Sequence, residues 1–292
     1  MSETSKQPTY MRQRFLLAFV RQLNGYIKST DLQKLVFLYL MREGQGFYDF
    51  LPYKYGSYSF QLAEDIDILR MGGYISIDYK AEGNSITAIG EYNVETAYTI
   101  TAERGDALIS KAYREYPYYA MNSEIIERLF FGEELERFEN LKNTYSRDGD
   151  VLFTIGYEGK SIESFINLLI QNDIRILCDV RKNPISRKFG FSKGKLEHIA
   201  QAVGIKYVHV PGLGIESDKR SSLESVEDYE ELFDDYEKTL LNRKRLLDEV
   251  YSLLNSDHRI ALMCYEGNPD MCHRHVIRDY LINEHMLRSI DL

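Results

Sequence analysis

The stretch VLFTIGYEGKS, residues 151–161, joins a continuous apolar run to a glycine-containing turn and then to a serine that can cap a helix. Similar apolar runs occur at 174–180, 206–210 and 259–264, and helical patterns follow at 162–171, 195–203, 229–254 and 272–283. Alternating strands and helices predict a mostly parallel sheet covered by helices on both faces. Continuously apolar strands are typical of such buried sheets. The second half of the chain is therefore predicted to be an α/β domain.

The chain changes character just before this stretch. Residues 140–150, NLKNTYSRDGD, are polar and rich in turn-forming residues, and 16 of the 23 tyrosines precede residue 151. We expect three parts: a first domain at 1–95, a helical connector at 96–150 and the α/β domain at 151–292. The connector is predicted to contain helices at 122–131 and 133–145 and to pack between the two domains.

The first domain reads as three helices followed by a hairpin. Helical spacing of apolar residues marks a helix around 15–23, a second capped by Thr30, and a third at 60–71 that ends at Gly72-Gly73. An aromatic loop, FYDFLPYKYGSYS, separates the second helix from the third. Strand patterns at 74–79 and 85–92 flank the turn 81–84. This order predicts an α+β domain of winged-helix type.

The sequence leaves open what such a domain would contact. Through LQKLVFLYL followed by PYKYGSYS, residues 10–92 loosely resemble winged-helix modules of antitoxin-like and phage-defence proteins. Such modules usually bind DNA through the third helix, but here that helix carries Glu64, Asp65 and Asp67 against Arg70, which would repel phosphate. Protein contact or homo-oligomer formation through this domain is an equal alternative.

Composition narrows the class of protein. In 292 residues, 44% hydrophobic and 28% charged, the three cysteines are too few for a disulfide framework, and no apolar run reaches the length of a membrane span. We therefore expect a cytoplasmic protein without a membrane partner. The net charge of -9 disfavours coating of nucleic acid through charge alone, so a nucleotide or nucleic-acid partner must be recognised by a local site.

The four strands of the α/β domain lead into unusual loops. These begin GYEGKS, DVRKNPISR, PGLG and YEGNPDMCHR, and loops that follow parallel strands meet at the carboxyl end of the sheet. The first loop resembles a Walker phosphate-binding loop, which requires a glycine five residues before its Gly-Lys pair. Position 154 is threonine, so the glycine-bounded loop is too short for that motif. We keep Gly156 and Tyr157 as lining of a ligand site.

The second loop carries the most concentrated positive charge. Arg181, Lys182, Arg187, Lys188, Lys193 and Lys195 fall in a segment without acidic residues, which favours a phosphate-bearing partner. The alternative is a solvated loop whose arginines pair with a neighbouring carboxylate such as Asp179.

The fourth loop carries groups capable of chemistry. Cys272 is expected at a helix N-terminus beside His273 and Arg274, which would lower its pKa and make it a better nucleophile than Cys264. Glu266 and Asp179 are candidates for general acid and base catalysis.

Three alternatives to nucleophilic catalysis involve the same residues: core packing of Cys264, a Cys264–Cys272 redox pair, or zinc bound by Cys264, Cys272, His273 and His275. The C-x7-C spacing lacks the usual zinc knuckle. We therefore predict neither a metal nor a cofactor.

These loops also resemble a known family. TIGYEGKSIESFINLL, CDVRKNPISRKFGFSKGKLEHIAQAVGIKYVHVPGLG and LMCYEGNPDMCHRHVIRDYL are similar to the bacterial domain-of-unknown-function family 488. The resemblance implies a Rossmann-like fold and places family motif positions on Gly156, Asp179, Arg181, Pro184, Ser186, Arg187, Phe191, Leu213, Gly214, Cys264, Glu266, Cys272, His273 and Arg274. The chain departs from the family in the first loop, where Gly156-Tyr157-Glu158 stands in place of the usual Gly-His-Ser, and in an acidic insertion at 216–235.

Two functional hypotheses follow. In the first, the α/β domain is an enzyme, a hydrolase or transferase, whose pocket binds a nucleotide or nucleic acid through Arg181 and Arg187, with Cys272, Glu266 and Asp179 near the reacting atom. In the second, the domain senses a nucleotide-like ligand and the first domain regulates DNA or a partner protein. A role in phage defence or stress fits either hypothesis.

Overall fold

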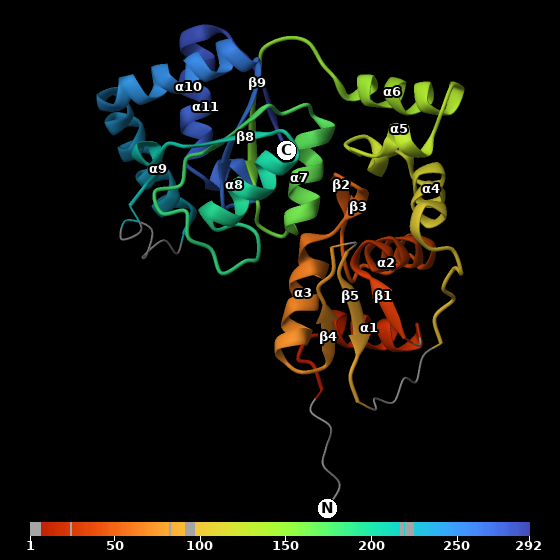
Figure 1. The fold of residues 1–292 in the computed structure, drawn as a ribbon. Helices are drawn as coiled ribbons and strands as arrows, with labels where there is room; N and C mark the ends of the chain where they lie inside the picture. The colour runs from red at the N-terminus through yellow and green to blue at the C-terminus, as the bar shows by residue number, and fades with distance from the viewer. Residues whose placement is uncertain (1–6, 24, 82, 91–96, 217–218, 220–224) are drawn as a thin grey trace, which may run out of the picture. The chain divides into compact units, whose positions relative to one another are not determined.

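The computed structural model describes residues 7–23, 25–81, 83–90, 97–216, 219 and 225–292 (Figure 1). The chain divides into two compact units, Met1–Asn143 and Thr144–Leu292. Several expected features lie outside the described residues: the boundary at 95/96, the end of the strand expected at 85–92, and residues 217–218 and 220–224 of the acidic insertion.

The N-terminal unit is an α+β fold with antiparallel strands, as predicted. Helices α1, α2 and α3 are followed by the strands β4 and β5, and β5 also pairs with β1, which gives the sheet order β1-β5-β4. The third helix is confirmed at its predicted bounds, 60–71, and Gly73, at φ +76°, follows its C-cap. The elements of this unit are α1 (Met11–Gln22), β1 (Tyr26–Lys28), α2 (Ser29–Glu43), β2 (Leu51–Tyr53), β3 (Gly56–Tyr58), α3 (Phe60–Met71), β4 (Ile75–Asp78), β5 (Ser85–Ala88), α4 (Gly105–Glu115), η1 (Pro117–Ala120), α5 (Ile126–Leu129) and α6 (Glu133–Tyr145).

Three local expectations for this unit were wrong. The aromatic stretch expected as a loop contains the hairpin β2–β3, whose tyrosines Tyr53 and Tyr58 pack together at 5.0 Å between ring centroids. Thr30 lies inside the first turn of α2, because Lys28 is the N-cap. The helix expected at 122–131 shrinks to the four residues of α5. The later helices contribute Leu108, Tyr113 and Phe138 to the same core as α1 and α2.

Asp65 of α3 is buried, so its charge does not face solvent as the sequence argument assumed. Its carboxylate accepts hydrogen bonds from Arg12 at 2.6 Å, Gln13 at 2.8 Å and Tyr48 at 3.0 Å. This cluster joins α3 to α1 and offsets the buried charge. Of the three acidic residues expected to repel phosphate, only Glu64 and Asp67 remain at least partly accessible.

Lys34 of α2 is buried. Its ammonium group donates to the Ser57 carbonyl at 2.6 Å, at the edge of a pocket of about 410 Å³ that Tyr53, Tyr55 and Tyr58 help to line. Burial lowers the pKa of Lys34 from 10.5 to about 7, and the nearby Asp31 opposes part of this shift. The folded unit therefore holds this group partly neutral near pH 7.

Lys34 should make stability depend on pH. Between pH 7 and 10.5 the unfolded chain binds a proton at this lysine that the folded chain lacks, so unfolding free energy rises with pH by up to about 1.4 kcal/mol per unit. We expect Lys34→Met to remove this slope and the exposed Lys28→Met to keep it. Urea unfolding at pH 7, 8, 9 and 10, followed by hydrogen exchange in peptides from 11–43, measures both. A constant difference between Lys34→Met and the wild type would contradict the assignment.

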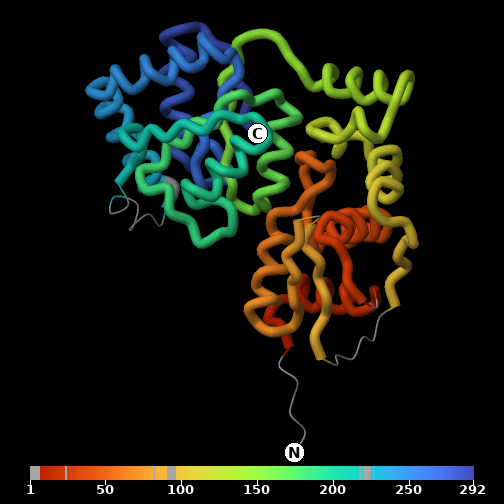
Figure 2. The backbone as a smooth tube through the Cα atoms, in the orientation of Figure 1, coloured from red at the N-terminus to blue at the C-terminus, as the bar shows by residue number. Residues whose placement is uncertain are grey.

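The C-terminal unit is an α/β fold around a parallel sheet, as predicted, and the sheet has five strands where four were expected. The strand order is β10-β6-β9-β7-β8, and every neighbouring pair is parallel. Figure 2 traces the excursion of α9 and α10, in teal to blue, between β8 and β9. The elements are β6 (Val151–Gly156), α7 (Ile162–Gln171), β7 (Ile176–Asp179), α8 (Lys193–Ala202), β8 (Lys206–His209), η2 (Pro211–Leu213), α9 (Val226–Leu240), η4 (Leu241–Arg243), α10 (Lys244–Asp257), β9 (Arg259–Cys264), η5 (Pro269–Met271), α11 (Arg274–His285) and β10 (Arg288–Asp291).

Burial explains this arrangement. Residues of α9, α10 and α11 form one core with alternate strand residues such as Leu152, Ile176 and Ile260. The intervening residues, among them Phe153 and Leu177, are also fully buried and point to the opposite face. Both faces of the sheet are therefore covered.

Two expectations for this unit need correction. The single helix expected at 229–254 is two helices, because the chain breaks at η4, where Leu240 is buried and Leu241 is 67% exposed. The strand β10 was not expected. It pairs with β6 at the edge of the sheet, and its short, half-polar sequence RSID carries little strand signal.

Candidate functional site

The four loops predicted to converge do line one cavity. It lies at the carboxyl ends of β6, β7, β8 and β9 and has a volume of about 350 Å³. Each loop contributes at least one side chain, and the lining residues are Tyr157, Arg181, Lys182, Asn183, Ile185, Ile215, Cys264, Tyr265, Glu266 and His273. This edge is where open α/β sheets place their ligands.

Two motif glycines let the loops approach one another. A Cβ at Gly156 would lie 1.7 Å from the Glu266 carbonyl oxygen, and one at Gly214 would lie 2.2 Å from the backbone nitrogen of Lys182. Neither position can hold a side chain without moving backbone. The absence of a side chain at these two glycines allows the close packing between the loops.

Arg274 is a second element that holds the loops together. Its side chain is fully buried and donates to the Thr154 hydroxyl at 3.2 Å and to the carbonyls of Glu266 at 2.5 Å and Gly267 at 3.0 Å. Because these bonds tie the fourth loop to β6, Arg274 positions Glu266 rather than lining the cavity.

Asp179 and Arg181 form a buried ion pair. Arg181 donates to both carboxylate oxygens of Asp179, at 2.8 and 2.5 Å, and further to the Tyr157 hydroxyl and the Phe191 carbonyl. Asp179 also accepts from the Tyr207 hydroxyl at 2.6 Å, and burial together with this carboxylate raises the pKa of Tyr207. Four of the five N–H groups of Arg181 are thus used within the protein.

The rest of the second loop is mostly structural. Phe191 is fully buried and stacks on the Tyr157 ring at 4.3 Å between centroids. The Ser186 hydroxyl accepts from the backbone of Lys188, and the Pro184 carbonyl accepts from that of Lys193. Arg187 is exposed and is not among the residues described as lining the cavity.

Tyr157 and Glu158, the two positions of the first loop that differ from the family motif, both make hydrogen bonds to other loops. The Tyr157 hydroxyl receives the Arg181 hydrogen bond at 3.1 Å, and the Glu158 carboxylate accepts from the backbone of Gly267 at 2.8 Å. In this chain, Tyr157 and Glu158 therefore hold the second and fourth loops.

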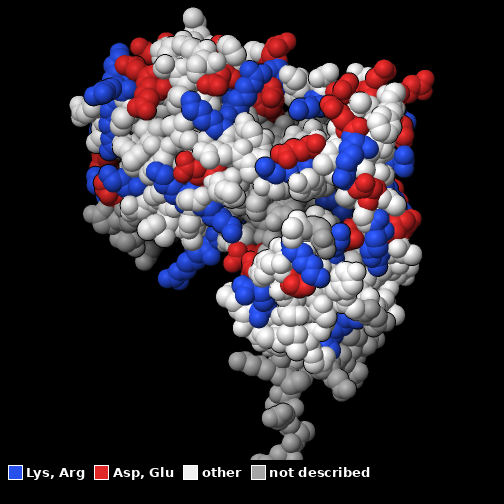
Figure 3. All heavy atoms as spheres, viewed as in Figure 1, with Lys and Arg blue, Asp and Glu red and all other residues white. Residues whose placement is uncertain are grey.

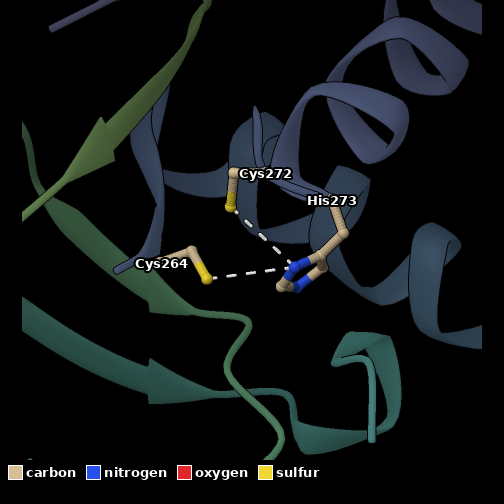
Figure 4. A group of neighbouring side chains, drawn as sticks. All are labelled: Cys264, Cys272 and His273. Atoms are coloured by element: carbon tan, nitrogen blue, oxygen red, sulfur yellow. Dashed lines mark hydrogen bonds between the residues drawn. The ribbon is translucent and has the colours of Figure 1, made fainter. Parts of the chain in front are cut away.

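Cys264, Cys272 and His273 form a compact cluster at the cavity (Figure 4). The sulfur atoms of both cysteines lie 3.9 Å from Nδ1 of His273, and Figure 4 shows the two thiols directed at that nitrogen. The three atoms lie within 4.8 Å of one another. His273 Nε2 is 3.1 Å from the Val180 carbonyl, which can only accept, so Nε2 carries the proton and Nδ1 presents a lone pair to the thiols.

The expected environment of Cys272 was wrong. Cys272 precedes the N-cap of α11 and closes the 3-10 turn η5, so it does not lie in the first turn of a helix. It is fully buried, and burial and the adjacent Cys264 raise its pKa well above the usual range. Cys264, which had been ranked second, is the thiol that lines the cavity.

Sequence reasoning missed part of the lining. Asn183 and Ile185 belong to the basic loop, where only their position near Arg181 could have singled them out, whereas Lys182 was already part of the positive charge predicted to favour phosphate. Tyr265 is the first residue of the fourth loop but was given no role, and Ile215 directly follows Gly214 of the third loop. Tyr236 of α9, whose ring packs edge-on to His273 at 5.6 Å, lies in a helix with no motif, so the sequence held no signal for it.

Comparison with known proteins gives one match. Residues 161–281 match a family described as "Domain of unknown function DUF488", which confirms the resemblance of the loops and covers three of the four. Searches of curated proteins and of solved structures each found no match. No helix among the described residues is long and apolar enough to cross a membrane.

Proposed function

We propose that the C-terminal unit, which contains a DUF488 domain, is an enzyme acting on a phosphate-bearing substrate, a nucleotide or a nucleotide unit of a nucleic acid. The observation that carries the proposal is the composition of the cavity. Its lining includes Cys264, His273 and Glu266, which can exchange protons or bind electrophiles, together with the cation Lys182. The volume of about 350 Å³ lies at the lower end of the range for small-molecule sites.

Lys182 is the cation best placed for a phosphate. Its ammonium group is 2.6 Å from Glu216, and both side chains are partly exposed, at 35% and 53%. A surface pair of this kind contributes little stability, so a phosphate can take the place of Glu216 at small cost. Arg181 has one N–H left for a ligand and chiefly positions the loop.

Apolar side chains at the cavity support a ring-bearing substrate. Ile185 is 84% exposed and Tyr265 45% exposed, and both line the cavity. An aromatic face that remains accessible can stack on a nucleobase. Figure 3 shows acidic and basic side chains interspersed over the face in view, which favours such local recognition over a broad electrostatic surface.

Lys182→Ala should weaken nucleotide binding. We expect nucleoside monophosphates to bind at least tenfold more tightly than the matching nucleosides, because the phosphate contacts Lys182, and we expect the substitution to abolish that difference. Lys206→Ala is the matched control, because Lys206 is exposed at the opposite end of β8. Isothermal titration calorimetry on the full chain measures both variants.

Two further outcomes decide the proposal. Equal losses in the two lysine variants, or no nucleotide bound at millimolar concentration, would refute the phosphate site. Turnover of a bound nucleotide, followed by chromatography, should fall about 100-fold or more in Glu266→Gln while binding persists, since general acid–base groups contribute on this scale.

A regulator is the second candidate function. The support for it is the order of elements in the N-terminal unit, three helices α1–α3 and then the antiparallel strands β4 and β5, on which the winged-helix interpretation rests. In that case the full chain binds duplex DNA or a partner protein and turns over no nucleotide. Binding of duplex DNA that is unaffected by Lys182→Ala, together with no turnover, would favour the regulator.

A further inference from the structure

We propose that Cys264, Cys272 and His273 bind one zinc ion at the wall of the cavity. Two cysteine sulfurs and an imidazole nitrogen are the ligands that zinc prefers, and soft thiolates select against magnesium and calcium. All three side chains are 1% exposed or less, and they come from the end of β9 and from the segment between η5 and α11. The C-x7-C spacing lacked the usual zinc knuckle, but the fold brings both sulfur atoms to the same imidazole nitrogen.

The distances match a tetrahedral site. With zinc bonds of about 2.3 Å to sulfur and 2.0–2.1 Å to nitrogen, a nitrogen and a sulfur ligand lie about 3.6 Å apart. Both Sγ–Nδ1 distances are 3.9 Å, and no pair among the three ligand atoms exceeds 4.8 Å. Small side-chain movements therefore bring all three atoms to bonding distance.

His273 is oriented as metal-binding histidines are. Its Nε2–H is held by the Val180 carbonyl at 3.1 Å, which fixes the tautomer and leaves Nδ1 as the ligand atom. The edge-on ring of Tyr236, held by its own 2.5 Å hydrogen bond to the Leu213 carbonyl, packs against the imidazole. A backbone carbonyl on the second nitrogen is a common outer partner of zinc-bound histidine.

The site would have the form of a catalytic zinc centre. Among the described residues the cluster contains three ligands, so a fourth position is left for water or substrate, whereas structural sites usually have four protein ligands. Cys264 and His273 line the cavity, and so does Glu266. The fourth position therefore opens toward the space assigned to the substrate.

This placement deepens the proposed function and, for its catalytic part only, rests on it. Zinc lowers the pKa of bound water. In a hydrolysis, the hydroxide oxygen bonds to the electrophilic atom of the substrate, and the bond from that atom to its leaving group breaks. Glu266 carries the water proton to that group.

Metal binding can be tested without a substrate. We expect the full chain, purified with a thiol-free reductant, to retain one zinc per chain by elemental analysis. After chelation it should take up Co²⁺ with the sulfur-to-metal charge-transfer absorption and intense visible bands of a tetrahedral thiolate site. Zinc affinity, measured against a competing chelator, should fall at least about 100-fold in Cys264→Ser and in Cys272→Ser, since even outer partners are worth ten- to a hundredfold.

Two variants serve as matched controls. Cys178→Ala removes the third cysteine, which is buried in β7 outside the cluster, and His275→Gln removes the histidine next to the ligands. Both should keep one zinc and the cobalt spectrum. Circular dichroism checks that each serine variant is folded, and the spectrum of the wild type tests the site even where a variant does not fold.

Several outcomes would overturn the metal site. These are a reduced, folded wild type that binds zinc no more tightly than about micromolar, a cobalt spectrum without thiolate absorption, or full zinc retention in both serine variants. A Cys264–Cys272 disulfide in reduced preparations, found by mass, would also end it. Failure of nucleotide binding with zinc still held would refute the proposed substrate and leave the metal site standing.

Discussion

Gly156→Ala should lower the unfolding free energy of the C-terminal unit by about 3 kcal/mol or more, because the new Cβ would meet the Glu266 carbonyl oxygen at 1.7 Å. Backbone cannot rotate away as a side chain can, so β6 or the fourth loop must move. Gly156 pairs with Cys264 in the sheet, and the movement therefore reaches the thiol cluster. We expect the variant to lose zinc affinity together with stability.

Gly194→Ala is the matched control for this change. Gly194 lies in α8, and a Cβ there would meet no atom within 4 Å. Alanine is the better helix former, so stability should stay the same or rise by up to about 1 kcal/mol. Urea unfolding followed by hydrogen exchange in peptides from 151–292 compares the two. If Gly156→Ala is as stable as Gly194→Ala, the first and fourth loops can move apart without loss of stability, and the prediction is wrong.

Arg181→Met is expected to have the second large effect, a loss of about 3–5 kcal/mol in unfolding free energy. The substitution leaves the Asp179 carboxylate fully buried without its cation, and removing one partner of a buried ion pair costs on this scale. The double variant Asp179→Asn/Arg181→Met should recover much of the loss, because no unpaired charge remains. The same unfolding assay measures both.

Arg187→Met separates this structural effect from loss of charge. Arg187 belongs to the same basic loop but is exposed, so its replacement should change stability by less than about 0.5 kcal/mol. If Arg181→Met proves as stable as Arg187→Met, the pair with Asp179 does not hold the loop, and a direct role for Arg181 in anion binding regains its place.

The sequence predicted secondary structure best where backbone periodicity and burial together determine the pattern of apolar residues. The apolar run of β9 and the helix α7 were predicted at their observed bounds, and parallel topology alone predicted that the four loops would meet. By contrast, β10 has four residues and no fully buried side chain, so hydropathy could not separate it from a tail.

The chemistry of the site was less accessible to sequence reasoning. Arg181 and Asp179 are two residues apart, which allowed pairing as an alternative but could not show that four N–H groups are used. The 3-10 turn at Pro269 changes where Cys272 lies, and no spacing rule predicts it. The tautomer of His273 depends on the Val180 carbonyl, more than ninety positions away in the chain.

The strand order carries a consequence for biosynthesis. β6 is the first strand of its sheet to be made, yet both its neighbours, β9 and β10, lie beyond residue 258. Each edge of this apolar segment stays open while the intervening hundred residues leave the ribosome, and pairing so distant in sequence is slow. We therefore expect the apolar β6 segment to remain unpaired in the nascent domain until β9 has been synthesised.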